Sequence, residues 1–251
     1  MSPTLLPMPD FFMTLLPLLC LMLVHLFAYR LTFLEGIPRS VWLSGAGGVS
    51  VAYVFLHLFP ELQEGQAHVQ HAAQNKGLFF LKHHIYLMTL VGLVVFYGLE
   101  RFAITSRKGG KGDTAETPAS VFWVHIGSFT LYNALIGYLL HKREEQNVEE
   151  VLFYLVAMAL HFLVNDYGLR EHHKNRYRTI GRWILVTALA VGWGVGLSIE
   201  VSEAATALLL AFLAGGVVLN VLKEELPEER KSRFSAFLLG TGLYAGLLLL
   251  L

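Results

Sequence analysis

Polar side chains interrupt one apolar stretch of the chain in a pattern that could bind a metal ion. His161 is followed four residues later by Asn165 and then by Asp166. Residues at positions i and i+4 share one face of a helix, and imidazole beside amide or carboxylate oxygen suits zinc, iron or manganese. Ionisable groups are costly to bury in a membrane and mark ion sites by default. We therefore predict His161, Asn165 and Asp166 as metal ligands.

A second apolar stretch carries a polar stripe. His125, Ser128 and Tyr132 follow an i, i+3, i+7 spacing, and Asn133 comes next. This spacing places the first three on one side of a helix. His125 is therefore a further predicted ligand, and the other three are predicted to line a transport path. The alternative is that Ser128, Tyr132 and Asn133 only bridge helices by hydrogen bonds.

A third apolar stretch ends with His57, four residues before Glu61, and these are predicted as a ligand and a residue of the path. Three other histidine pairs are weaker candidates: His68 with His71 in an outer loop, His83 with His84 at the mouth of the helix expected at 78–99, and His172 with His173. The first two pairs are predicted on the outer side, where they either attract metal or are only solvated. The third is predicted in a basic inner loop against lipid headgroups.

The composition places all these residues in a membrane protein. The chain has 251 residues, of which 55% are hydrophobic and 15% charged, whereas soluble domains carry about a quarter charged residues. The apolar residues form eight blocks, at 11–29, 41–59, 78–99, 121–140, 151–168, 183–199, 204–222 and 234–251. Each is roughly 17–22 residues, enough for a helix to cross a bilayer. We predict an all-α integral membrane protein, a single domain over 1–251, with eight transmembrane helices.

The charges predict how these helices are oriented. Fifteen of the 19 Lys and Arg residues fall in the first, third, fifth and seventh connections. The positive-inside rule then places those connections in the cytoplasm and both termini outside, and we expect a bacterial inner membrane. The Gly-rich connection at 105–119 is predicted to be a flexible cytoplasmic loop. A formal net charge of zero gives no reason to expect a nucleic-acid partner.

Two of the predicted helices end alike. One runs from Gly-Gly to Pro-Glu over Gly47–Glu61, and another does so over Gly215–Glu228. By the predicted topology the first travels outward and the second inward, which suggests an inverted repeat of the kind found in transporters. The alternative is that Gly-Gly packs helices closely and Pro-Glu ends them.

These endings resemble the ZIP (Zrt/Irt-like) family of divalent-metal transporters. FLHLFPE at Phe55–Glu61 looks like that family's helix 2 ending, and FLAGGVVLNVLKEELPEE at Phe212–Glu229 looks like its helix 7. The resemblance implies eight helices with both termini outside, arranged as an inverted repeat of helices 1–3 and 6–8 around helices 4–5.

The sequence departs from the family at the metal ligands. The helix 4 pattern, HNxPEG, falls on SFTLYN at Ser128–Asn133, so that a ligand histidine becomes serine and the acid becomes tyrosine. The helix 5 pattern falls on HFLVND at His161–Asp166, where His161 is kept and Phe162 replaces a ligand. We therefore do not expect this chain to hold the family's two-metal centre. We expect a single, weak metal site instead.

The expected function is transport of a divalent cation, zinc, iron or manganese, which is a substrate rather than a bound cofactor. The alternative is a ZIP-fold protein that no longer transports and serves as a scaffold or assembly partner, as a homodimer or with another membrane protein. A membrane metallohydrolase is the third reading, and it requires three ligands and an open position for water. His57, His125 and His161 are predicted at different depths, so we do not expect an enzyme.

Overall fold

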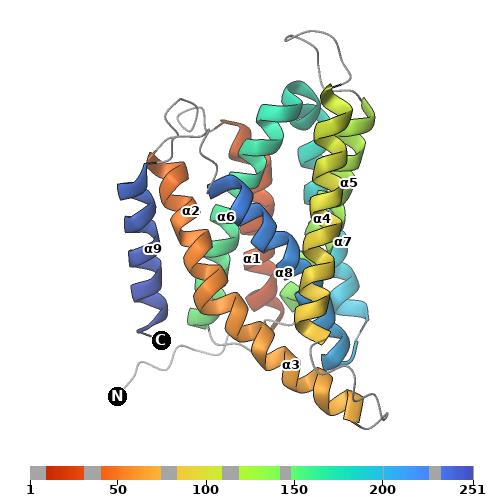
Figure 1. Cartoon of the computed structure of the whole chain (residues 1–251), viewed down its shortest axis with the longest axis vertical. Coiled ribbons are helices and arrows are strands. Elements are labelled where there is room, and N and C mark those ends of the chain that lie inside the picture. Colours follow the sequence, from red (N-terminus) through yellow and green to blue (C-terminus); the bar gives the residue numbers. More distant parts are fainter. Residues whose placement is uncertain are drawn as a thin grey trace.

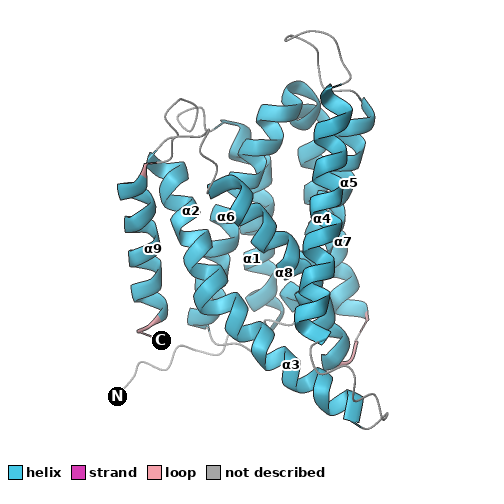
Figure 2. Cartoon of the chain, in the orientation of Figure 1, coloured by secondary structure: helices cyan, strands magenta, loops and turns pink. Residues whose placement is uncertain are grey.

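The computed structural model describes residues 10–30, 41–74, 84–108, 119–141, 148–199, 201–225 and 233–250. Within these ranges the chain is helical almost throughout and contains no strand (Figures 1 and 2). The predicted all-α class is confirmed for this part of the chain. The helices lie mostly along the long axis of the molecule (Figure 1).

The helices are long and apolar, as a bilayer requires. They are α1 (Asp10–Phe27), α2 (Val41–Tyr53), α3 (Phe59–Gln74), α4 (His84–Lys108), α5 (Ala119–His141), α6 (Val148–Arg176), α7 (Arg182–Ser198), α8 (Glu203–Glu225) and α9 (Phe234–Leu248). By length and composition, five helical stretches among the described residues could cross a membrane: Val41–Gln70, His84–Phe102, Ala119–Leu140, Val151–Ser198 and Glu203–Lys223. Two shorter apolar helices, Phe12–Phe27 and Phe234–Leu248, lie beside them.

The helix that was predicted to end near residue 59 instead continues to Gln74. A π-helical turn at Val54–Leu58 joins α2 to α3, and the backbone N–H of Phe59 donates to the carbonyl of Val54. Proline clashes with the carbonyl four residues before it in an α-helix. The wider turn just ahead of Pro60 accommodates its ring, so this proline does not stop the helix. His68 therefore lies on a helix rather than in a loop.

The predicted inner loop between residues 168 and 183 is also helical. α6 runs to Arg176, and a π-helical turn at Tyr177–Gly181 leads into α7. Lys174 has a φ of 40° and breaks the helix there, which is why the 48-residue apolar stretch Val151–Ser198 turns back instead of running straight. His172 and His173 thus belong to α6. Residues 109–118 of the predicted flexible loop lie outside the described part.

Three helix pairs touch through glycine, namely α2 with α9, α4 with α8, and α5 with α7. A Cβ atom on Gly48 would come 2.2 Å from the carbonyl of Phe237, one on Gly215 would come 2.1 Å from that of Thr89, and one on Gly192 would come 1.9 Å from that of Ala134. Such distances are impossible for real side chains, so each pair is in direct backbone contact. Small residues permit this close packing between membrane helices.

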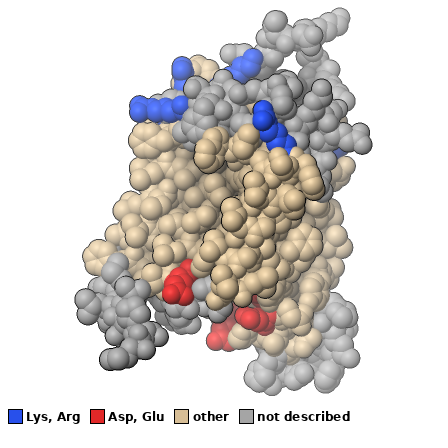
Figure 3. All heavy atoms as spheres, turned by 90° about the vertical axis from the view of Figure 1, so that its left-hand side faces the viewer, with Lys and Arg blue, Asp and Glu red and all other residues tan. Residues whose placement is uncertain are grey.

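Charge is separated along the molecule. On the face shown in Figure 3, Lys and Arg gather at one end, Asp and Glu lie toward the other, and other residues fill the band between them. Large apolar side chains also point outward, among them Leu239, Leu243 and Val94. An apolar band between polar ends is what a lipid bilayer would surround.

Candidate polar site at the centre of the helix bundle

A histidine on α1 joins two polar residues of α5 and α6. Nδ1 of His25 lies 2.9 Å from both carboxylate oxygens of Asp166, and its Nε2 lies 2.8 Å from Oδ1 of Asn133. Each of the three residues is only 1% exposed. The ring of Phe162 stacks on His25, with centroids 4.4 Å apart. This His25–Asp166–Asn133 triad ties three helices together inside an apolar bundle.

His161 stands in a second buried network beside the triad. Its Nε2 is 2.7 Å from the hydroxyl of Tyr132 and 3.0 Å from Nδ2 of Asn165. Tyr132 directly precedes Asn133 on α5, and Asn165 directly precedes Asp166 on α6. The two networks are therefore neighbours along both helices and form one buried polar zone. The i, i+4 relation predicted for His161 and Asn165 is present as a hydrogen bond.

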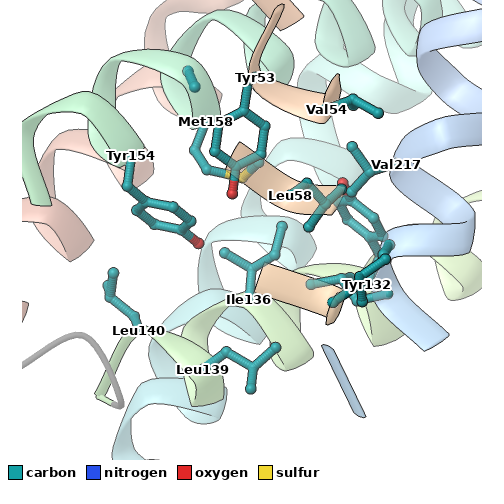
Figure 4. Close-up of a cluster of buried hydrophobic side chains, with 14 of the residues drawn as sticks. Tyr53, Val54, Leu58, Tyr132, Ile136, Leu139, Leu140, Tyr154, Met158 and Val217 are labelled. Carbon is teal, nitrogen blue, oxygen red and sulfur yellow. The ribbon is translucent and has the colours of Figure 1, made fainter. Parts of the chain in front are cut away.

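Apolar side chains of four segments border this zone. In Figure 4, Tyr132 and Ile136 of α5 lie among Met158 of α6, Leu58 of the π-helical turn and Val217 of α8. Tyr132 is 1% exposed and Ile136 fully buried. A polar group surrounded in this way depends on its hydrogen bonds, because neither water nor headgroups can replace them.

His125 belongs to a separate network near the ends of α4 and α8. Its Nε2 lies 2.7 Å from Glu100, whose other oxygen is 2.8 Å from the ammonium of Lys223. Its Nδ1 lies 3.0 Å from Nε2 of His173, which is 6% exposed. The prediction that His173 lies in a loop against lipid headgroups is wrong, because α6 continues and brings this ring into the bundle. We call Glu100, His125, His173 and Lys223 the end network.

The remaining predicted site residues lie apart from the polar zone. His57 stacks on Tyr53 with centroids 5.2 Å apart, and its Nε2 is 3.9 Å from a carboxylate oxygen of Glu61. Both side chains are partly exposed. Ser128 donates to the carbonyl of His125 on its own helix, so it does not bridge helices through this bond.

The structure thus divides the predicted metal ligands among four settings. His161 pairs with Asn165, Asp166 pairs with His25, His125 with Glu100 and His173, and His57 with Tyr53 and Glu61. In the part of the chain that is described, no group of three or more His, Cys, Asp or Glu side chains could hold a metal ion. The predicted ligands do not form one coordination shell in this conformation.

Sequence reasoning missed His25, Glu100 and Lys223 as members of these networks. His25 lies within the first apolar stretch, so the rule that marked His161 applies to it equally. The pairing of His25 with Asp166 spans 141 residues and leaves no trace in local spacing. Glu100 and Lys223 were missed because their partners come from other helices.

Comparisons with known proteins add no relative: no family model, no curated protein and no solved structure matches this chain.

Proposed function

We propose that this protein is a membrane transporter of the ZIP-like type that moves a divalent cation through the zone between α1, α5 and α6. The observation that carries the proposal is the buried polar zone itself. His161, Asn165 and Asp166 lie almost fully buried on α6, where the resemblance expects metal ligands. His25 of α1 and Asn133 of α5 are buried beside them. Such residues inside membrane helices typically serve ion or proton pathways.

The helix contacts support the inverted repeat that belongs to this proposal. In an eight-span reading, α2 continued by α3 is span 2, α4 is span 3, α8 is span 7 and α9 is span 8. An inverted repeat makes span 2 equivalent to span 7 and span 3 equivalent to span 8. The α2–α9 pair then corresponds to the α8–α4 pair, and both pairs touch through glycine. It also makes α1 equivalent to α7 and α5 equivalent to α6, so that the α1–α6 contact corresponds to the α7–α5 contact. An inverted repeat predicts these equivalences.

The charge distribution supports the orientation. The end with Lys and Arg in Figure 3 would face the cytoplasm and the opposite end the outside. The His125–Glu100–Lys223 contacts would then lie toward the inner side, and the ion pair of His68 and Glu203, at 2.9 Å, toward the outer side. The protein would reside in a bacterial inner membrane.

Uptake into proteoliposomes tests the proposal. Purified protein is reconstituted, and the entry of Zn²⁺, Fe²⁺ and Mn²⁺ is measured beside His161→Ala and Ser198→Ala. Ser198 is exposed and its hydroxyl donates to the carbonyl of Gly194 on its own helix, so its replacement controls for reconstitution. We expect uptake by the unaltered protein, the same uptake by Ser198→Ala, and none by His161→Ala. Folded protein that takes up none of the three ions would contradict transport of these ions.

A scaffold that has lost transport is the second candidate, and one observation favours it. Phe162 and Tyr132 fill positions where the resemblance expects ligands, and both are packed into the bundle at 0% and 1% exposure. These side chains form the interior rather than a coordination shell. Absence of uptake by the folded protein would favour this candidate over the transporter.

A further inference from the structure

The amide orientation of Asn133 defines the role of His25. Nδ2 of Asn133 donates to the carbonyl of Phe129 at 2.8 Å, which leaves Oδ1 facing Nε2 of His25 at 2.8 Å. An amide oxygen can only accept a hydrogen bond. Nε2 of His25 must therefore carry a proton.

The other ring nitrogen faces the acid. Nδ1 lies at the same distance, 2.9 Å, from both oxygens of Asp166. The ring of Phe162 stacks on the same imidazole. The ring of His25 is therefore held between the carboxyl group, the amide oxygen and an aromatic face.

The same oxygen atoms are those that a metal ion would use. Carboxylate and amide oxygens suit manganese and other divalent cations. Here Asp166 and Asn133 direct their oxygens toward one buried point, and the ring of His25 occupies that point. Phe162 stands where the resemblance has a ligand, and it packs on the histidine instead.

We propose that Asp166 and Asn133 form a divalent-cation site that is filled in this conformation by the ring of His25. His25 is a tethered surrogate for the ion, and a divalent cation binds the two oxygen-bearing side chains only when the histidine withdraws. This inference rests on the proposed function in one respect, that the cation is the transported one.

Binding of Mn²⁺ by the full-length protein in detergent tests the inference, with free Mn²⁺ measured by electron paramagnetic resonance. Removing the surrogate by His25→Ala should lower the dissociation constant for Mn²⁺ at least about tenfold relative to the unaltered protein. His25→Gln, which removes the ring but keeps a polar side chain, provides the same test if the alanine variant does not fold. Two controls accompany them: His25→Ala combined with Asp166→Asn, and His68→Ala, which removes an exposed histidine elsewhere.

The expected result is a gain of binding in the His25 variants that is lost in the double variant and absent in His68→Ala. No gain on removing His25, or a gain that survives Asp166→Asn, would overturn the inference. If the unaltered protein takes up a cation but the His25 variants gain no Mn²⁺ binding, transport is supported and its cation site lies elsewhere. A gain of binding without any uptake would uphold the site and contradict transport.

Discussion

Two kinds of helix contact hold this bundle, and they differ in what they allow. The α2–α9, α4–α8 and α5–α7 pairs meet backbone to backbone at glycines such as Gly48, Gly215 and Gly192. The contact of α1 with α5 and α6 instead depends on a buried ion pair and hydrogen bonds, those of His25 with Asp166 and Asn133. A contact at glycine depends on shape alone, so no other group can take the place of the neighbouring backbone. A polar contact can be replaced, because each donor or acceptor can bind a different group.

This difference indicates which helix contacts stay rigid and which can open. The paired helices should behave as stiff units, because even one added methyl group would force them apart. The polar zone can open whenever its groups find substitutes, such as water or an ion. The following variants test this difference between the two kinds of contact, in order of decreasing expected effect.

The largest loss of stability is expected for Asp166→Ala. This substitution leaves His25 buried without its acid, and breaking a buried ion pair typically costs about 3–5 kcal/mol. Thermal unfolding in detergent should show a clear drop in Tm. The double variant His25→Leu with Asp166→Leu should recover most of this loss, because apolar replacement of a whole buried pair is often neutral. A double variant as unstable as the single one would show that the pair itself stabilises the bundle.

Gly192→Leu should rank next. Its side chain would collide with the carbonyl of Ala134 on α5, and overpacking commonly costs about 1–3 kcal/mol. Gly194, two residues along the same helix, has nothing within 4 Å of an added Cβ, so Gly194→Leu is the matched control. Equal Tm values for the two leucine variants would contradict the close α5–α7 contact.

Tyr132→Phe should have a smaller effect. It removes one hydrogen bond to His161 but keeps the ring, and hydrogen bonds between membrane helices are worth about 0.6 kcal/mol on average. The Tm should fall slightly, whereas cation uptake should change more if His161 lies on the path. Uptake equal to that of the unaltered protein would remove Tyr132 from the predicted path.

The smallest effect is expected for Glu100→Gln in the end network. The glutamate is partly accessible, and its partner Lys223 is 30% exposed, so solvent screens their ion pair. The amide can still accept from Lys223 and bond to His125. A change in Tm larger than that of Tyr132→Phe would show that the end network carries more of the stability than its exposure suggests.

The sequence predicted the helical class and most of the helix positions, because a bilayer imposes length and apolarity on each span. It was wrong about where helices end at Pro60 and in the region of His173. A π-helical turn absorbs Pro60, and a single break at Lys174 replaces a loop. Neither event has a local sequence signature that propensity alone would reveal.

The candidate site was predicted in part for a related reason. His161 and Asn165 were found together because they lie on one helix at i, i+4. The partner of Asp166 was missed because it comes from α1, far away in the chain. Contacts between distant helices depend on how the helices pack, and the spacing of residues in a single sequence does not carry that information.

The π-helical turn ahead of Pro60 has a consequence for how this chain tolerates changes in length. Such a turn contains one residue more than an ordinary turn, inserted into an otherwise regular helix. Deleting one residue within Val54–Leu58 would return the turn to α-helical register and keep the faces of α2 and α3 aligned, although the ring of Pro60 would then press on the carbonyl four residues before it and bend the helix. Elsewhere in a helix, the same deletion would rotate everything beyond it by about 100°. This turn is therefore the place along Val41–Gln74 where the loss of one residue keeps both helix faces in register.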